Sequence, residues 1–312
     1  MLKALLALTV IVATPTFAAE WTYTDGAGKT VTLPEAPQRI VAHINSAAAL
    51  IPLGIRPVGI FIDGPPAMDL AMDGLDLTDV DIIQGGWFDL NAEQLLALEP
   101  DLILTEWSSR EQAYNGAVGE AAIAERIESI APVVGVAQGQ SILGIIEDYE
   151  ALAESLGADP AADSEDKATF EAALARFKAG VSAKPGLTVM AVSPSSSSLS
   201  IAVPGEFAEL SDFKAWGLDL VEPQRDADSS YQTLSWENAN LYPADLLLVD
   251  DRWGRASLDA IAYQPLAQRL PAVAAGQLDA WPAGWIRNYR VYAEQLDKLS
   301  EVIEASDADV VE

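Results

Sequence analysis

Short apolar runs alternate with amphipathic helical patterns along most of the chain. After a hairpin pattern at residues 21–33, apolar runs follow one another with helical patterns between them, and the same order of elements restarts near residue 187. The runs predicted as strands are 39–42, 57–62, 80–84, 102–105, 132–137, 187–192, 199–203, 244–249 and 277–281. The predicted helices are 46–53, 91–98, 142–156, 207–216, 236–241 and 289–304, with one or two short ones at 258–270. Because parallel strands need long crossover connections, this alternation predicts an α/β fold with mostly parallel sheets flanked by helices.

The stretch between the two halves has the pattern of a single long helix. Asp159 is suited to cap its first turn, Pro160 is tolerated at the first helical position, and Gly180 is suited to end it. Apolar side chains recur at helical spacing at Phe170, Ala173, Leu174 and Phe177. At 1.5 Å per residue, about 20 residues make a rod of roughly 30 Å, the diameter of a small domain. An ordinary surface helix has the same pattern, so its interpretation depends on what flanks it.

A short internal repeat flanks it on both sides. Asn91 and Glu93 begin a helical pattern, and an Asp eight residues after the Glu opens an apolar strand. Ser235, Glu237 and Asp245 stand in the same order at the same stage of the second half. The sequence therefore predicts two similar α/β lobes, residues 19–158 and 181–312, joined by one long spanning helix, residues 159–180.

Residues 1–18 have the pattern of an export signal. Lys3 precedes an apolar run at 4–13, and small residues at 16–18 follow Pro15 as a cleavage site. The run is shorter than the roughly 20 residues that a membrane span needs. No cysteine follows it that could carry a lipid. We therefore expect a cleaved signal peptide and a periplasmic protein with neither stable membrane insertion nor a lipid anchor.

Composition narrows the classes of partner and chemistry. The 312 residues carry a formal net charge of -29, which disfavours nucleic acid and anionic lipid surfaces. The absence of cysteine excludes disulfides, thiolate metal sites and cysteine nucleophiles. One histidine, His43, makes a bare transition-metal site built from imidazoles a poor expectation. We therefore expect no resident cofactor or metal.

Eight segments within residues 22–304 form a recognisable set by their order and spacing: 24–32, 37–41, 53–59, 91–93, 99–104, 152–157, 243–249 and 270–277. In these segments the chain resembles the periplasmic binding proteins of ABC importers for ferric siderophores, haem and cobalamin. The resemblance implies two α/β lobes joined by one long helix, with the ligand held between them. It implies as partners a metal chelate and an ABC importer permease dimer, and we expect the carrier to be a monomer. In that family an acidic residue of each lobe docks on permease arginines, which assigns this role to Glu93 and Glu237. Both residues also suit the stabilisation of a helix N-terminus.

Loops at the carboxyl ends of parallel strands are where open α/β sheets bind ligands. The candidates for ligand contact in the predicted loops are His43, Trp87, Trp107, Arg110, Tyr231, Arg252, Trp253, Trp285 and Tyr289. Aromatic faces and arginine hydrogen bonds suit a bulky, partly apolar chelate. Each residue also has a simpler interpretation: His43 as a core or capping group, the tryptophans as lobe packing, and Arg252 as a partner of its acidic neighbours.

Charge bears on the identity of the ligand. An acidic protein repels polyanionic chelates such as ferric citrate, within the limits of screening, and so favours a neutral or cationic ferric chelate of the hydroxamate type. The predicted function is a non-catalytic carrier. A haem or cobalamin carrier with His43 as an axial ligand is one alternative. A secreted α/β hydrolase is another alternative. Against it, the chain has no Gly-x-Ser-x-Gly elbow, and its only histidine precedes nearly every candidate serine and aspartate, which is the wrong order for that fold.

Overall fold

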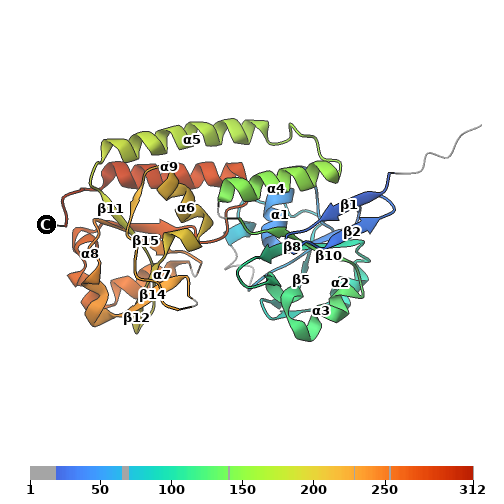
Figure 1. The fold of residues 1–312 in the computed structure, drawn as a ribbon, viewed down its shortest axis with the longest axis horizontal. Coiled ribbons are helices and arrows are strands. Elements are labelled where there is room, and N and C mark those ends of the chain that lie inside the picture. Colours follow the sequence, from blue (N-terminus) through green and yellow to red (C-terminus); the bar gives the residue numbers. More distant parts are fainter. Residues whose placement is uncertain (1–18, 65–69, 140, 228, 253, 312) are drawn as a thin grey trace, which may run out of the picture.

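The computed structural model describes residues 19–64, 70–139, 141–227, 229–252 and 254–311, and it contains two separate six-stranded sheets (Figure 1). The predicted export signal, residues 1–18, lies outside the described residues. Among those residues, no helix combines the length and apolar character that crossing a membrane requires. Each sheet has helices on both faces, so the predicted α/β class with two lobes is confirmed.

The first lobe is built on a sheet of parallel strands. In the order in which they pair, these are β10 (Val133–Ala137), β8 (Leu102–Ser108), β3 (Ile40–His43), β4 (Gly59–Phe61) and β5 (Asp81–Ile83). Short antiparallel pieces add to this lobe: β1 (Trp21–Thr24) with β2 (Thr30–Leu33), β6 (Gly85–Gly86) with β7 (Asp89–Leu90), and β9 (Ala113–Tyr114) on β8. Its helices are α1 (Ile44–Leu50), α2 (Ala92–Ala97), α3 (Ala121–Glu128) and α4 (Ile142–Ser155), with 3-10 turns η2 (Leu70–Met72) and η3 (Gly116–Gly119).

Alternate side chains of these strands enter two different cores. Ala42 and Leu104 pack with α1 and α4, whereas Val41 and Ile103 pack with α2 and α3 on the opposite face. This period-2 alternation explains why the strands appear in the sequence as unbroken apolar runs, since both faces are covered. Helix α3 is absent from the prediction.

The second lobe has a mixed sheet. Its pairing order is β14 (Tyr231–Ser235), β12 (Ser198–Ala202), β11 (Thr188–Pro194), β15 (Leu246–Asp250) and β16 (Leu278–Trp281), and β13 (Asp219–Leu220) pairs with β11. Strands β13, β15 and β16 run parallel within the sheet, while β12 pairs antiparallel with both of its neighbours. The helices are α6 (Ala208–Ala215), α7 (Arg255–Ala262), α8 (Pro271–Ala275) and α9 (Tyr289–Ala305), with η4 (Pro204–Glu206), η5 (Trp236–Leu241) and η6 (Pro265–Arg269). Residues 236–241 were predicted as a helix, and in the structure they form the 3-10 helix η5.

The internal repeat corresponds to equivalent positions in the two sheets. Asp101, just before β8, accepts hydrogen bonds from the backbone of Gln38 and Arg39, which lead into the neighbouring strand β3. Asp245, just before β15, accepts one from the first residue of its neighbour β11, Thr188. In both lobes, therefore, an aspartate ties together the starts of two adjacent parallel strands.

The long helix α5 (Ser164–Ala183) extends over the second lobe towards the first, with α9 packed beneath it (Figure 1). It begins later than predicted because Asp159 instead caps a separate turn, accepting a hydrogen bond from the backbone of Ala161, and Asp163 is the N-cap residue. The prediction that Gly180 ends the helix is wrong. Gly180 lies within α5 and faces Ile303 of α9, and the helix continues to Ala183. One continuous apolar core lies beside α5 and α9 and includes residues of both lobes.

Candidate functional site

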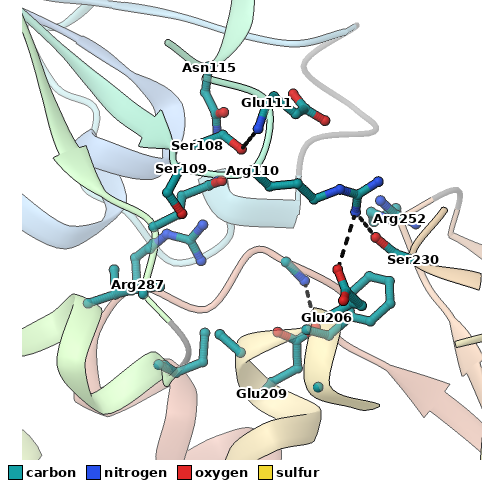
Figure 2. A pocket seen from close by; sticks show the side chains of 18 of the residues that line it. Ser108, Ser109, Arg110, Glu111, Asn115, Glu206, Glu209, Ser230, Arg252 and Arg287 are labelled. Atoms are coloured by element: carbon teal, nitrogen blue, oxygen red, sulfur yellow. Dashed lines mark hydrogen bonds and ion pairs between the residues drawn. The ribbon is translucent and has the colours of Figure 1, made fainter. Parts of the chain in front are cut away.

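A cavity of about 540 Å³ lies between the lobes and is lined by both of them (Figure 2). The first lobe contributes Trp87, residues 108–111, Asn115, Gln138, Gly139, Ile142 and Ile145. The second lobe and the segment before α9 contribute residues 205–209, residues 229–231, Arg252, Gly284 and Arg287. The volume lies within the usual range for small-molecule sites. Most of the lining side chains are polar or charged.

Arg287 and Glu106 form a buried ion pair at one wall of the cavity. Arg287 precedes α9 and Glu106 lies in β8, and they are 4% and 0% exposed. The guanidinium donates to both carboxylate oxygens, at 2.8 Å from Nη2 to Oε2. Although burial opposes its ionisation, the charge and hydrogen bonds of Arg287 keep the pKa of Glu106 below its ordinary value. The pair therefore joins the two lobes with both groups charged.

Arg252 is fixed against the second lobe. Its Nε donates to both oxygens of the buried Asp250, at 3.0 and 3.1 Å, and its Nη2 donates to the Tyr231 hydroxyl at 2.8 Å. Burial raises the pKa of Tyr231 to about 12, so its hydroxyl stays protonated at neutral pH. The hydroxyl proton remains for a ligand acceptor, because Arg252 occupies a lone pair of the oxygen.

Arg110 reaches from the end of β8 across the cavity to the second lobe (Figure 2). Its Nη1 donates to the hydroxyl of Ser230 and lies 3.8 Å from Oε2 of Glu206. Glu206 is also paired with Arg225, at 2.8 Å. The Arg110 side chain is 45% exposed, so it bridges the lobes at a solvent-accessible position rather than within a core.

Glu209, in the first turn of α6, is the most deeply buried carboxyl of the cavity wall that has no arginine bonded to it. It is 1% exposed, and its Oε1 accepts hydrogen bonds from Trp281 Nε1 at 3.1 Å and from the backbone of Gly284 at 3.0 Å. Burial raises its pKa, against the opposing effect of these donors. Among the described side chains, none forms an ion pair with it.

Four of the nine predicted contact residues line the cavity. They are Trp87, Arg110, Tyr231 and Arg252. Trp253 lies outside the described residues. The structure places His43, Trp107, Trp285 and Tyr289 elsewhere, each for a local reason.

His43 is fully buried at the end of β3. Its Nδ1 accepts from the backbone of Asn45, as N-cap of α1, so Nε2 carries the proton and donates to Asp63 at 2.8 Å. Both ring nitrogens are thus engaged. This leaves neither of them to ligate a chelated metal in the cavity or to activate a serine.

Trp107 and Tyr289 pack against other aromatic residues. Trp107 makes an edge-to-face contact with Tyr114, with ring centroids 5.0 Å apart, because side chains alternate along β8 and its neighbour Ser108 lines the cavity. Tyr289 is 3% exposed and packs against Phe170 of α5.

Trp285 lies at a separate, smaller cavity of about 200 Å³, where its Nε1 donates to Asp251 at 3.0 Å. Burial raises the pKa of Asp251 to about 6.

Sequence reasoning placed Arg287 in a second-lobe binding loop without selecting it as a contact residue, and it missed Glu206 and Glu209. Arg287 stands in a predicted second-lobe loop, but nothing in its surroundings marks its pairing with Glu106, 181 residues away. Glu206 stands in the loop between the predicted strand 199–203 and the predicted helix 207–216, and Glu209 stands near the start of that helix. Glu209 has the pattern of an ordinary acidic residue in the first turn of a helix.

Glu93 and Glu237 are both exposed, one on each lobe. Asn91 caps α2 beside Glu93 through hydrogen bonds to the backbone of Glu93 and Gln94. The pKa of Glu237 is lowered by hydrogen bonds from its own backbone N–H and from Ser235. Helix α2 and strand β14, which leads into η5, lie on the side of their lobes that faces away from α5 (Figure 1).

The described residues contain no group of three or more histidine, cysteine, aspartate or glutamate side chains placed to hold a metal ion.

Comparison with known proteins identifies relatives along most of the chain. A family model described as "Periplasmic binding protein" matches residues 77–283. DesE, a ferric-siderophore receptor protein from Streptomyces coelicolor, is 30% identical, with a TM-score of 0.81 over 92% of this chain and 99% of that chain.

More distant structures share the fold. SirA from Staphylococcus aureus complexed with staphyloferrin B is 18% identical, with a TM-score of 0.62 over 92% of this chain and 99% of that chain. FhuD from Vibrio cholerae bound to Fe3+–Desferal is 19% identical, with a TM-score of 0.63 over 86% of this chain and 98% of that chain. A search of curated proteins found no match.

Proposed function

The chain belongs to the periplasmic binding protein family, and we propose that it captures a ferric siderophore between its lobes and delivers it to the permease of an ABC importer. The observation that carries this proposal is the polar cavity of about 540 Å³ lined by both lobes. The similarity of the chain to a ferric-siderophore receptor protein, at 30% identity over nearly its whole length, supports the choice of ligand. The protein acts as a carrier, not as an enzyme.

The ligand is a ferric chelate of the hydroxamate type rather than a polycarboxylate. Each arginine that lines the cavity already faces a carboxylate: Arg110 faces Glu206, Arg252 faces Asp250, and Arg287 faces Glu106. A polyanion would have to displace these carboxylates or approach them closely. A neutral or cationic chelate meets no such repulsion, and its oxygens can accept the hydrogen bonds of the arginines and Tyr231.

Titration of the intrinsic tryptophan fluorescence of residues 19–312 tests the ligand class. We expect a ferric trihydroxamate to bind at least tenfold more tightly than ferric citrate, and tighter citrate binding would overturn the assignment.

The place of binding is tested with a cavity-filling substitution. Ser109→Trp adds bulk to the cavity wall, and Ser129→Trp adds the same bulk on the exposed surface beyond α3. Loss of binding in the first variant alone supports the cavity as the binding site. Equal binding by both variants would place the ligand elsewhere.

Glu93 and Glu237 are the two anchors for the permease, one on each lobe. A permease dimer presents two equivalent surfaces, and the internal repeat gives the carrier two matching ones. We expect Glu93→Arg and Glu237→Arg to abolish uptake of the labelled chelate by cells while its binding to the purified carrier is unchanged. Glu171→Arg, an exposed site on α5 at the opposite side, is the matched control. Normal uptake with both docking variants would refute the role.

Residues 1–18 serve as the export signal, and the carrier works as a soluble periplasmic monomer. N-terminal sequencing and native mass spectrometry of the protein from the periplasmic fraction test both statements. A retained leader, a lipid-modified chain or a stable dimer would contradict them.

The lobes, residues 19–158 and 181–312, move little on binding. Besides α5 and the Glu106–Arg287 pair, Asp212 of α6 accepts a hydrogen bond from the backbone of Ile142 at the start of α4, in the other lobe. These buried contacts would break in a large opening. Small-angle scattering with and without chelate should therefore give nearly equal radii of gyration, and a clear contraction on binding would contradict a stiff hinge.

A further inference from the structure

The cavity wall contains a buried carboxylate that lacks a cation. Glu209 is 1% exposed, and its Oε1 is held by the indole N–H of Trp281 and the backbone N–H of Gly284. These donors stabilise the carboxylate but bring no positive charge to it. A buried charge of this kind is costly unless a partner of opposite sign completes it.

No cation among the described residues is bonded to Glu209. The charge of Arg287 favours the ionised form of Glu209, but the guanidinium itself is bonded to Glu106. The lining contains three arginines and three glutamates, Glu111, Glu206 and Glu209. Two further carboxylates, Glu106 and Asp250, stand directly behind the lining and occupy Arg287 and Arg252. The described groups at the site therefore sum to a negative charge, in a protein that is itself strongly acidic.

The two sides of the cavity differ in what they offer a ligand. Figure 2 shows Arg110 at the side of the pocket opposite Glu209, with Arg287 at a third position on the wall. Arg110, Arg252 and Tyr231 can donate hydrogen bonds to the oxygens that surround a chelated ferric ion. Glu209 can accept hydrogen bonds from a donor group at the opposite end of the same ligand.

We propose that the bound chelate carries a protonated amine, and that Glu209 recognises this amine by a charge-assisted hydrogen bond. The proposal rests on the proposed function, because it assumes that the cavity holds a ferric siderophore. Glu209 is then a specificity-determining residue that selects cationic chelates. A ferric ion does not take this place, since the oxygens of the chelate already surround it. Burial raises the pKa of Glu209, and an ammonium group beside it would favour its carboxylate form in the complex.

The test uses a linear ferric trihydroxamate with a terminal primary amine and its N-acetylated form, which keeps the iron centre and removes the charge. For the wild-type protein we expect the amine form to bind at least tenfold more tightly than the acetylated form. In Glu209→Gln this ratio should fall below twofold, while affinity for the acetylated form stays within twofold of wild type. The amide oxygen of Gln can still accept from Trp281 and Gly284, so the fold should persist.

Glu171→Gln is the matched control, because it removes the same charge from an exposed position on α5, outside the cavity lining. It should leave the ratio within threefold of the wild-type value. Equal binding of the two chelates by the wild-type protein would overturn the proposal, and this comparison holds even if a variant fails to fold. A large ratio that survives in Glu209→Gln, or that is lost equally in Glu171→Gln, would also overturn it. Failure of both chelates to bind would instead refute the proposed function.

Discussion

Replacing Arg287 by methionine should destabilise the protein more than most single substitutions. The change keeps much of the side-chain volume but leaves the carboxylate of Glu106, 0% exposed, without its cation. The amides of Gln138 and Asn115 would still donate to Glu106, at 3.1 and 3.4 Å, but neither brings a charge. Breaking a buried pair in this way typically costs about 3–5 kcal/mol. With an unfolding entropy of about 2.1 cal/mol/K per residue and about 300 residues, the melting temperature should fall by roughly 5–8 °C.

The loss of stability in Arg287→Met, relative to the wild-type protein, should depend on pH. In the wild-type protein Arg287 holds the pKa of Glu106 below its unfolded value despite burial, so the pair stabilises the fold above that unfolded value. This stability is lost as the pH falls through the lowered folded pKa. In Arg287→Met burial acts unopposed and raises the pKa of Glu106. The difference between variant and wild type should therefore be largest near pH 8 and should shrink towards pH 4.

Urea unfolding followed by circular dichroism at pH 8 and at pH 4 measures both effects. The double variant Glu106→Gln/Arg287→Met completes the cycle and should be more stable than Arg287→Met alone, because no charge is left buried. A loss below about 1 kcal/mol at pH 8, an equal loss at both pH values, or additive single effects would refute the reasoning.

Three further predictions concern residues outside the cavity lining. Gly180→Ala should stabilise the fold by about 0.5–1 kcal/mol, because the added Cβ makes only ordinary contact with α9 at 3.9 Å and alanine has the higher helix propensity. A lower melting temperature of the variant would contradict this. His43→Ala should cost about 1–3 kcal/mol but leave the visible spectrum of a bound ferric chelate unchanged, and a spectral shift would show metal contact. Because burial raises the pKa of Asp251 to about 6, its ionisation opposes folding. The contribution of Asp251 to the free energy of unfolding therefore falls as the pH rises from about 4 to 6. Asp251→Asn should lessen this fall in urea unfolding, and an unchanged slope would contradict the assignment.

The fold could be predicted largely because its signals are local. Strands covered on both faces, such as β8 and β15, appear as unbroken apolar runs, and the caps at Asn91 and Ser235 recur with fixed spacing. The errors were also local. Gly180 resembles a helix end in sequence, but it lies within α5 because α9 packs close to that position. Helix α3 was missed, and Asp163 caps α5 in place of Asp159.

The site was harder to predict because loop position does not fix the direction of a side chain. Trp107 and Ser108 are neighbours in β8, yet only Ser108 lines the cavity, since successive side chains of a strand point to opposite faces. His43 ends a strand at the expected edge, but it turns inward to cap α1 and bond Asp63.

Two α/β lobes, a long helix between them and the family could be inferred from the residues alone, because short-range patterns and their order along the chain carry that information. Which charges meet depends instead on the folded arrangement of the lobes. The carboxylate of Glu106 finds its cation 181 residues away, while Glu209, on the wall of the same cavity, has none among the described residues. Such pairings depend on how the two sheets are held relative to one another, and the spacing of residues along the sequence does not predict that arrangement.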